Sequence, residues 1–170
     1  MNHKKATFGA GCFWGVEAIF QELDGVVATS VGYMGGNTED PTYQDVCYSE
    51  TNHAEVCEIV YDPNVISYTD LLSVFFSLHD PTTLNRQGPD VGTQYRSAIF
   101  YNDDDQKAQA LDALKQIEDG KFFTRPVVTE VTKAATFYKA EDYHQSYYQN
   151  KGITPHCGIG SVNVKLKEME

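Results

Sequence analysis

Hydrophobic and polar positions repeat with two different periods along the first hundred residues. Four segments have β-branched or alternating apolar positions and predict strands, over residues 4–10, 26–36, 53–63 and 93–101. Two segments place their apolar positions on one helical face and predict helices, over residues 14–23 and 67–80. Ser67 suits the N-cap of the second helix. The stretches 37–52 and 81–92 are polar and predict loops. The resulting order of elements is β-α-β-β-α-β.

The second part of the chain extends this plan. We expect an amphipathic helix with an acidic first turn, then a strand and a further helix, over residues 103–118, 126–132 and 140–150. Residues 151–170 have no period and several chain breakers, so we expect a mobile C-terminal coil. The β-α-β-β-α-β order is that of the split βαβ plan, an α+β architecture with helices on one face of a sheet. No linker or repeat interrupts the 170 residues, and we expect one domain over residues 1–170.

Composition narrows the possible classes of partner. The formal net charge is −11, from 13 basic and 24 acidic residues, and no basic stripe is present. This argues against binding to nucleic acid or to an anionic membrane surface. No stretch approaches the length of a membrane span, and the N-terminus lacks the pattern of a signal peptide, so we expect a cytoplasmic protein. The four cysteines contain no C-x-x-C pair, and in the cytoplasm such thiols are more often reduced or catalytic than structural.

Cys12 lies in the stretch "FGAGCFWGVEAIF", at or just before the start of the first predicted helix. Unpaired N–H groups and the helix dipole favour an anion there, so a thiolate would be stabilised. Gly11 and Gly15 would let a substrate approach the backbone. Phe13 and Trp14 cannot easily share the helical face of the other apolar residues, and beside a reactive thiol they would form an apolar cradle for a small group. The alternatives are an inert buried cysteine and two core aromatics.

Glu55 shares one face of its predicted strand with Cys57, Ile59 and Tyr61, which are unusual neighbours for a carboxylate. If the side chain is buried, its pKa would rise and it could carry a proton near neutral pH. The alternative is a solvated carboxylate on an edge strand.

The remaining polar candidates have ordinary structural interpretations when each is taken alone. Tyr43 and Tyr95 would be packed tyrosines with satisfied hydroxyls, and Asp90 would be a turn former. Cys157 stands in the C-terminal coil, either as a tail cysteine without a role or as a thiol mobile enough to reach another one. Cys47 and Cys57 are expected to be bystanders, and His53 and His144 to be structural.

Several motifs occur together in one order along the chain: "GCFWGVE", "GYMGG", "PTYQDVC", "HAEVCEIVYDP", "HDPTTLNRQGPDVGTQYRS" and "YHQSYY". In this set and order the chain resembles the type A peptide methionine sulfoxide reductases over nearly its whole length. The resemblance implies a two-layer α/β sandwich with a ferredoxin-like core. It also implies an enzyme without metal or organic cofactor that reduces methionine-S-sulfoxide, free or in oxidised proteins, and so repairs them. Nothing in the sequence demands more than a monomer.

The resemblance also implies a role for each candidate residue. Cys12 would attack the sulfoxide sulfur, Glu55 would protonate its oxygen, and Cys157 would condense with the resulting sulfenic acid to a disulfide. Thioredoxin would reduce that disulfide. Five side chains would bind the substrate. Phe13 and Trp14 would contact its methyl group, and Tyr43 and Tyr95 would hydrogen-bond its oxygen. Asp90 would help to hold the site and its water.

The chain departs from the family pattern at three places. Asn52 precedes His53 where glycine is common, and Pro89 precedes Asp90 where asparagine is common. Some members carry a second cysteine in the C-terminal coil, whereas no cysteine follows Cys157 here. If the resemblance holds, the cycle should stop at one disulfide, Cys12–Cys157.

Two other classes of function remain open from sequence. One is a redox-sensing or sulfoxide-binding module, in which Cys12 and Cys157 form a signalling disulfide without turnover. The intact set of polar candidates argues against it, because a sensor needs no proton donor. The other is a cysteine hydrolase, which needs a histidine base near Cys12 that His53 or His144 would have to supply.

Overall fold

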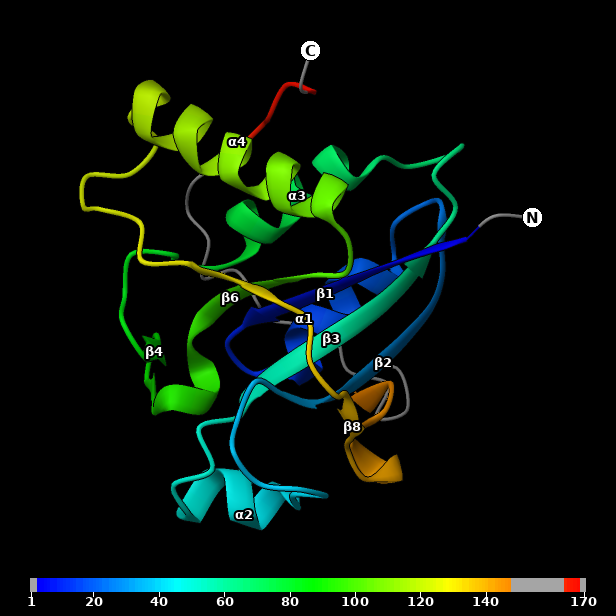
Figure 1. The fold of residues 1–170 in the computed structure, drawn as a ribbon, viewed down its shortest axis with the longest axis vertical. Helices are drawn as coiled ribbons and strands as arrows, with labels where there is room; N and C mark the ends of the chain where they lie inside the picture. The colour runs from blue at the N-terminus through cyan, green and yellow to red at the C-terminus, as the bar shows by residue number, and fades with distance from the viewer. Residues whose placement is uncertain (1–2, 148–163, 169–170) are drawn as a thin grey trace.

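A six-stranded sheet forms the centre of the computed structural model, which describes residues 3–147 and 164–168 (Figure 1). The sheet order is β7-β6-β1-β3-β2-β8, and every neighbouring pair is antiparallel except β6 and β7, which are parallel. The strands are β1 (Lys4–Ala10), β2 (Val26–Met34), β3 (Ala54–Tyr61), β6 (Ser97–Tyr101), β7 (Glu130–Lys133) and β8 (Tyr138–Lys139). The expectation of a mixed α and β fold is confirmed.

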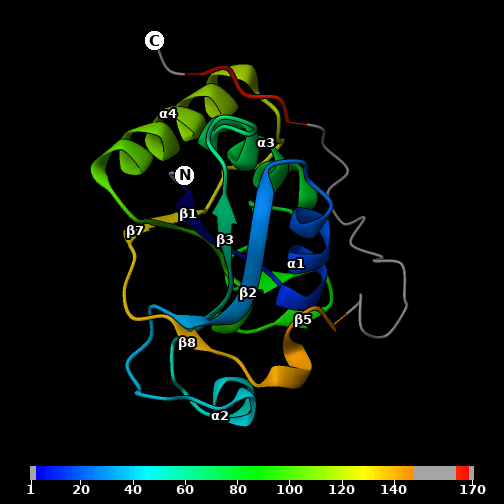
Figure 2. The same ribbon diagram turned by 90° about the vertical axis from the view of Figure 1, so that its right-hand side faces the viewer.

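Three helices cover one face of this sheet: α1 (Phe13–Gln21), α3 (Tyr68–Leu78) and α4 (Asp104–Gly120). Phe8 on β1 lies at the centre of their shared core, where its ring stacks with rings from α1 and α3 at centroid distances of 5.0–5.9 Å: Phe20, Tyr68 and Phe75. Figure 2 shows α1 lying along β2 and β3. The opposite face of the sheet has a smaller cluster that includes Val56 and Phe100 and packs against Ala134 and Phe137.

Ser67 caps α3 as expected, through a capping box with Asp70. The predicted polar loops, however, contain regular elements. The first contains the short helix α2 (Tyr43–Tyr48), closed by a capping box between Thr42 and Asp45. Only Val46 of this helix is buried, so no hydrophobic period reveals it. The second contains a hairpin of β4 (Arg86–Gln87) and β5 (Asp90–Val91).

Three predicted boundaries are wrong. The segment 93–101 begins as a 3-10 turn, η1 (Thr93–Tyr95), and becomes a strand only at Ser97. The strand expected over 126–132 forms later, as β7. The helix expected over 140–150 does not begin at residue 140: the described part of this segment, residues 140–147, forms a 3-10 turn, η2 (Asp142–His144), and becomes helical only at Tyr147. The helix cannot begin earlier because Ser146 has a φ of 52° and its N–H donates to Glu17.

The described part of the C-terminal tail, residues 164–168, has no regular secondary structure and packs against α3 and α4. Val164 and Leu166 are buried, and their N–H groups donate to the hydroxyls of Ser77 and Ser73 on α3. Among the described residues, no helix combines the length and apolarity needed to cross a membrane.

Candidate active site

Cys12 is the N-cap residue of α1, as the sequence predicts. The turn that delivers it requires glycine at position 11, where φ is +94° and a Cβ would lie 2.8 Å from Cγ of Gln87. The Cys12 side chain is half-buried. At this position the N–H groups of the first helical turn and the positive end of the dipole stabilise negative charge on sulfur.

Glu55 lies beneath this turn, on the central strand β3. Its side chain is 1% exposed, and its Oε1 accepts a hydrogen bond of 3.3 Å from the backbone N–H of Phe13, the residue that follows Cys12. Its other oxygen, Oε2, is buried and has no hydrogen-bond partner. Burial raises the pKa of Glu55 to about 8, helped by the charge of Asp90 and opposed by the Phe13 hydrogen bond. The carboxyl is therefore largely protonated at pH 7, with one oxygen available.

Three further candidates lie within electrostatic range of Glu55. Tyr43 begins α2, Tyr95 ends η1, and Asp90 begins β5. Burial raises the pKa of Tyr95, and Glu55, Cys47, Asp90 and Cys12 raise it further through their charges. Burial likewise raises the pKa of Tyr43, with smaller effects from Cys47, Glu55 and Tyr95. Both phenols are therefore neutral hydrogen-bond donors near the protonated carboxyl.

Phe13 and Trp14 form one part of an aromatic cluster beside Cys12. Phe13 is buried, with its ring centroid 5.7 Å from that of Tyr33 and 5.3 Å from that of His144. Trp14 is half-buried and stacks on Tyr147 at 4.0 Å, with an angle of 11° between the rings. The cluster places apolar surface directly after the cysteine in the chain.

Two residues hold this cluster: His144, expected from the sequence to be structural, and Glu141, which the sequence does not single out. His144 is fully buried, and its Nδ1 accepts a hydrogen bond of 2.8 Å from the indole N–H of Trp14. Burial lowers the pKa of His144, which keeps Nδ1 free of a proton and able to accept. Glu141 accepts from the backbone N–H of Tyr43 at 3.1 Å and from the Tyr33 hydroxyl at 3.3 Å. The motif "YHQSYY" was the only signal for this region.

The cysteines differ in their surroundings. Cys47 lies in the site rather than apart from it, because its side chain is close enough to Tyr43, Tyr95 and Gln94 for these residues to affect its pKa. Burial raises the pKa of Cys47, and the interactions with these three side chains lower it by less. Cys57 is fully buried in the core, and its pKa is raised well above the ordinary value by that burial. Cys157 lies outside the described residues.

Neither histidine considered as a base for Cys12 is available for that role. His53 accepts the N–H of Gly36 at Nδ1 and contacts the carbonyl of Thr38 through Nε2. The Nδ1 of His144 is occupied by Trp14. Within residues 3–147 and 164–168, no group of three or more histidine, cysteine or acidic side chains is arranged to hold a metal ion.

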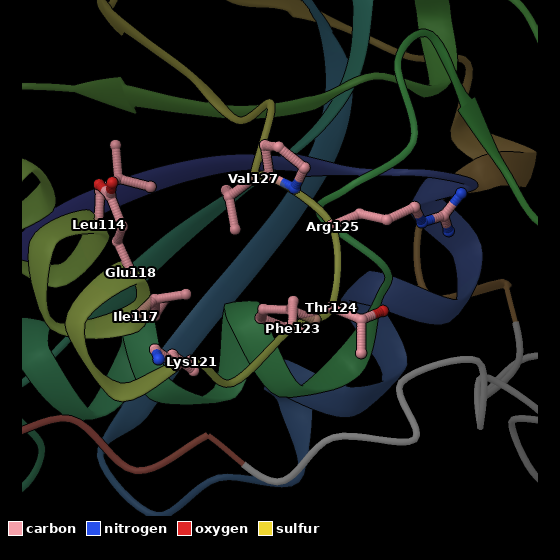
Figure 3. Close-up of a pocket in the computed structure, with 9 residues that line it drawn as sticks. Leu114, Ile117, Glu118, Lys121, Phe123, Thr124, Arg125 and Val127 are labelled. Carbon is pink, nitrogen blue, oxygen red and sulfur yellow. The ribbon is translucent and has the colours of Figure 1, made fainter.

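A cavity of about 470 Å³ lies between the end of α4 and the segment that follows it (Figure 3). Apolar side chains such as Leu114, Phe123 and Val127 line it, together with Lys121 and Arg125. None of the candidate residues lines this cavity, so it is separate from the candidate site around Cys12.

A family model described as "Peptide methionine sulfoxide reductase" matches residues 4–169. The chain belongs to the peptide methionine sulfoxide reductase family. A family member from Methanothermobacter thermautotrophicus, "Peptide methionine sulfoxide reductase MsrA", is 58% identical over 147 residues, which are 86% of this chain and 87% of that protein. The expectation of an oxidoreductase that reduces methionine sulfoxide is confirmed by these matches.

Solved structures of the same family agree with the fold. The structure of Mxr1 from Saccharomyces cerevisiae in reduced form superposes with a TM-score of 0.84 at 35% identity, covering 95% of this chain and 92% of that one. Mxr1 in complex with Trx2 superposes with a TM-score of 0.58 at 28% identity, covering 85% of this chain and 84% of that one.

Proposed function

We propose that the chain reduces methionine-S-sulfoxide, free or in oxidised proteins, with Cys12 as the nucleophile and Glu55 as the proton donor. The observation that carries this assignment is the buried, largely protonated Glu55 carboxyl, hydrogen-bonded to the first N–H after Cys12. A sulfoxide sulfur is a poor electrophile until its oxygen is protonated or strongly hydrogen-bonded. A neutral acid beside a thiolate therefore supplies both requirements of the reaction.

The other candidates bind the substrate around this pair. Tyr43 and Tyr95 donate hydrogen bonds to the sulfoxide oxygen, and Asp90 helps to hold the site and raises the pKa of Glu55. Phe13 and Trp14 receive the methyl group. Fixing the methyl group, the oxygen and the rest of the side chain at a chiral sulfur selects one epimer, the S-sulfoxide.

The catalytic cycle has three steps. The Cys12 thiolate attacks sulfur while Glu55 delivers a proton to oxygen, which gives methionine and a sulfenic acid on Cys12. The Cys157 thiol then condenses with the sulfenic acid, releasing water and forming a Cys12–Cys157 disulfide. A thioredoxin reduces this disulfide and is itself oxidised, in keeping with the Mxr1 complex with Trx2.

We also propose the architecture that accompanies this function. The order β6-β1-β3-β2, antiparallel throughout, supports a two-layer α/β sandwich with a ferredoxin-like core. One six-stranded sheet with one main core among the described residues supports a single domain over residues 1–170. A monomer suffices, since one chain supplies every described candidate residue. Recycling of the disulfide suits a reducing compartment such as the cytoplasm.

The decisive assay uses the two separated epimers of a blocked methionine sulfoxide, with dithiothreitol as reductant. We expect reduction of the S epimer only. A single turnover without reductant should consume two thiols, which peptide mapping should assign to Cys12 and Cys157. Reduction of neither epimer would favour the sensing module over the enzyme. A disulfide to another cysteine would overturn the role of Cys157 and keep the function.

A further inference from the structure

The side chain of Gln87 ties the β4–β5 hairpin to the end of α3. Gln87 is 2% exposed. Its Oε1 accepts a hydrogen bond of 2.8 Å from the backbone N–H of Asp80, and its Nε2 donates one of 2.8 Å to the Asp80 carbonyl. Both polar ends of this buried amide are bound to the backbone of one residue, and a loss of either partner would leave a buried group unpaired. The double contact therefore fixes the direction of the Gln87 side chain.

The Asp80 backbone is itself held in place. Asp80 directly follows His79, which is the C-cap residue of α3. His79 is buried, and its two ring nitrogens contact the Phe75 carbonyl at 2.6 Å and the Ser97 hydroxyl at 2.7 Å. Ser97 begins β6, so the end of α3 is anchored to the central sheet. Gln87 is thus bound to a rigid support.

The methylene groups of Gln87 pack against the turn that delivers Cys12. A Cβ on Gly11 would lie 2.8 Å from the Cγ of Gln87 and 3.0 Å from its Cβ, so the two residues are in direct contact. Gly11 has a φ of +94° and directly precedes Cys12, the N-cap residue of α1. Glycine has the widest choice of backbone conformations, so neighbouring contacts must hold this turn in one of them. Gln87 fills the space into which the turn would otherwise relax.

Gln87 is also in register with a second residue of the candidate site. It pairs with Asp90 across the β4–β5 hairpin. The charge of Asp90 helps to raise the pKa of Glu55. One buried side chain therefore relates the hairpin that carries Asp90 and the turn that carries Cys12 to the same support.

We propose that Gln87 is a positioning residue for the reduction, which holds the Gly11 turn against the end of α3 and so keeps the Cys12 sulfur at the N-terminus of α1. Gln87 acts through this turn, so it contributes to the attack on the sulfoxide and not to substrate affinity. A misplacement of about 1 Å can slow a chemical step about a hundredfold. The inference rests on the proposed role of Cys12 as the nucleophile and adds a residue that serves it.

The first test is the rate of a single turnover without reductant, measured as methionine formed after rapid quenching. Gln87→Ala removes the amide and the Cγ that faces Gly11. At saturating methionine-S-sulfoxide its rate constant should fall by about tenfold or more, while the half-saturating concentration stays within about twofold of the wild type. An unchanged rate constant, or a loss that appears only in the half-saturating concentration, would refute the positioning role.

The second test follows the surroundings of Cys12 in the absence of any sulfoxide. Iodoacetamide alkylates a cysteine faster as the pH rises and the thiolate forms, and mass spectrometry reports the reaction at Cys12 alone. A sulfur displaced from the helix N-terminus loses stabilisation of its thiolate, so in Gln87→Ala the midpoint of this pH profile should move upward by about one pH unit. A profile that coincides with the wild type would overturn the proposal.

A matched control separates positioning from a general loss of stability. Gln106 is 3% exposed, and its amide likewise binds two backbone groups, the N–H of Asn102 at 2.9 Å and the carbonyl of Lys5 at 2.6 Å. Gln106→Ala should lower the urea midpoint about as much as Gln87→Ala does. It should leave the single-turnover rate and the alkylation profile as in the wild type. Equal changes in both variants would refute a specific role of Gln87.

A conservative variant tests the hydrogen bonds to Asp80. In Gln87→Glu a neutral carboxyl can accept from the Asp80 N–H and donate to the Asp80 carbonyl, whereas an ionised one cannot donate. Burial favours the neutral form at low pH. The single-turnover rate relative to the wild type should therefore be close to one at about pH 5.5 and fall several-fold at about pH 8.5. A ratio that does not depend on pH would refute the role of the Asp80 contacts.

Failure of this inference and failure of the proposed function give different results. A wild-type protein that forms no methionine, together with an alkylation profile shifted only in Gln87→Ala, would refute the reductase cycle and retain the effect of Gln87 on Cys12. Equal single-turnover rates in the wild type and in Gln87→Ala would retain the reductase and refute the positioning role.

Discussion

Replacing Glu55 with glutamine should change stability and activity in opposite directions above neutral pH. In the wild type the folded protein holds the Glu55 proton up to about pH 8, whereas the unfolded chain releases it near 4.5. Between these values the folded state binds more protons than the unfolded state, so the contribution of Glu55 to stability falls as the pH rises. This difference in pKa corresponds to about 4–5 kcal/mol of unfolding free energy once the pH exceeds 8.

The Glu55→Gln variant keeps the shape and the acceptor for the Phe13 N–H but cannot ionise. Its unfolding free energy should therefore match the wild type at pH 4.5 and exceed it by about 4 kcal/mol at pH 9. Its turnover should fall by about a thousandfold below pH 8, because the proton donor is lost, and the difference should shrink above pH 8, where the wild-type Glu55 also loses its proton. Urea unfolding at several pH values, with kcat/KM for the S epimer, measures both effects.

The control for this prediction lies on the same strand. Glu58 is on the opposite face of β3 and pairs with Lys5 at 3.7 Å. Glu58→Gln should leave turnover as in the wild type, because this side chain lies on the face of β3 away from Cys12. A Glu55→Gln variant whose stability follows the wild type from pH 4.5 to 9 would refute the buried, protonated state of Glu55. A variant that is stabilised at high pH but fully active would refute its catalytic role alone.

Three further substitutions test the packing around the site. Gly11→Ala should lower the unfolding free energy by about 1–3 kcal/mol in urea, because a Cβ at φ +94° would meet Gln87. His144→Phe should leave the Trp14 indole N–H without its acceptor, which should lower the unfolding free energy by about 1–3 kcal/mol and raise KM for the sulfoxide. The fluorescence emission of Trp14, the only tryptophan, should shift in this variant. Phe8→Ala should cost about 3–5 kcal/mol in calorimetry or urea, because Phe8 is fully buried among three stacked rings, and unchanged stability would contradict the described core.

The parts of the fold that the sequence reveals are those with a strong hydrophobic period. Strand β3 alternates between half-buried and buried residues from Glu58 to Tyr61, and its first half is buried on both faces. The alternation correctly places Glu55 on the same face as Cys57, Ile59 and Tyr61, which are core residues. Helix α2 escapes prediction because its single buried residue, Val46, gives no period, and it is stabilised by local capping instead. The start of the helix expected over 140–150 is misplaced for a different reason, since the backbone after η2 is held at Ser146 by a hydrogen bond to Glu17 on α1.

The residues of the candidate site likewise divide into those that the sequence reveals and those that it does not. Cys12 and Glu55 stand out because each is an unusual residue for its place in a helix or strand. His144 and Cys47 do not, because what distinguishes them is contact with residues far away in the chain, such as the 130-residue separation between His144 and Trp14. A single sequence carries no direct signal for such pairings.

The Gln145 side chain has a consequence for behaviour at high concentration. Its Oε1 accepts from the Val31 N–H at 2.8 Å and its Nε2 donates to the Val31 carbonyl at 2.9 Å, as a neighbouring strand would. Strand β8 pairs with β2 only at Gly32 and Tyr33, so Gln145 extends the cover along β2 beyond the end of β8. Open strand edges are templates for intermolecular pairing and fibril growth. The Gln145 amide thus blocks one point on the outer edge of β2, at Val31, against pairing with another chain.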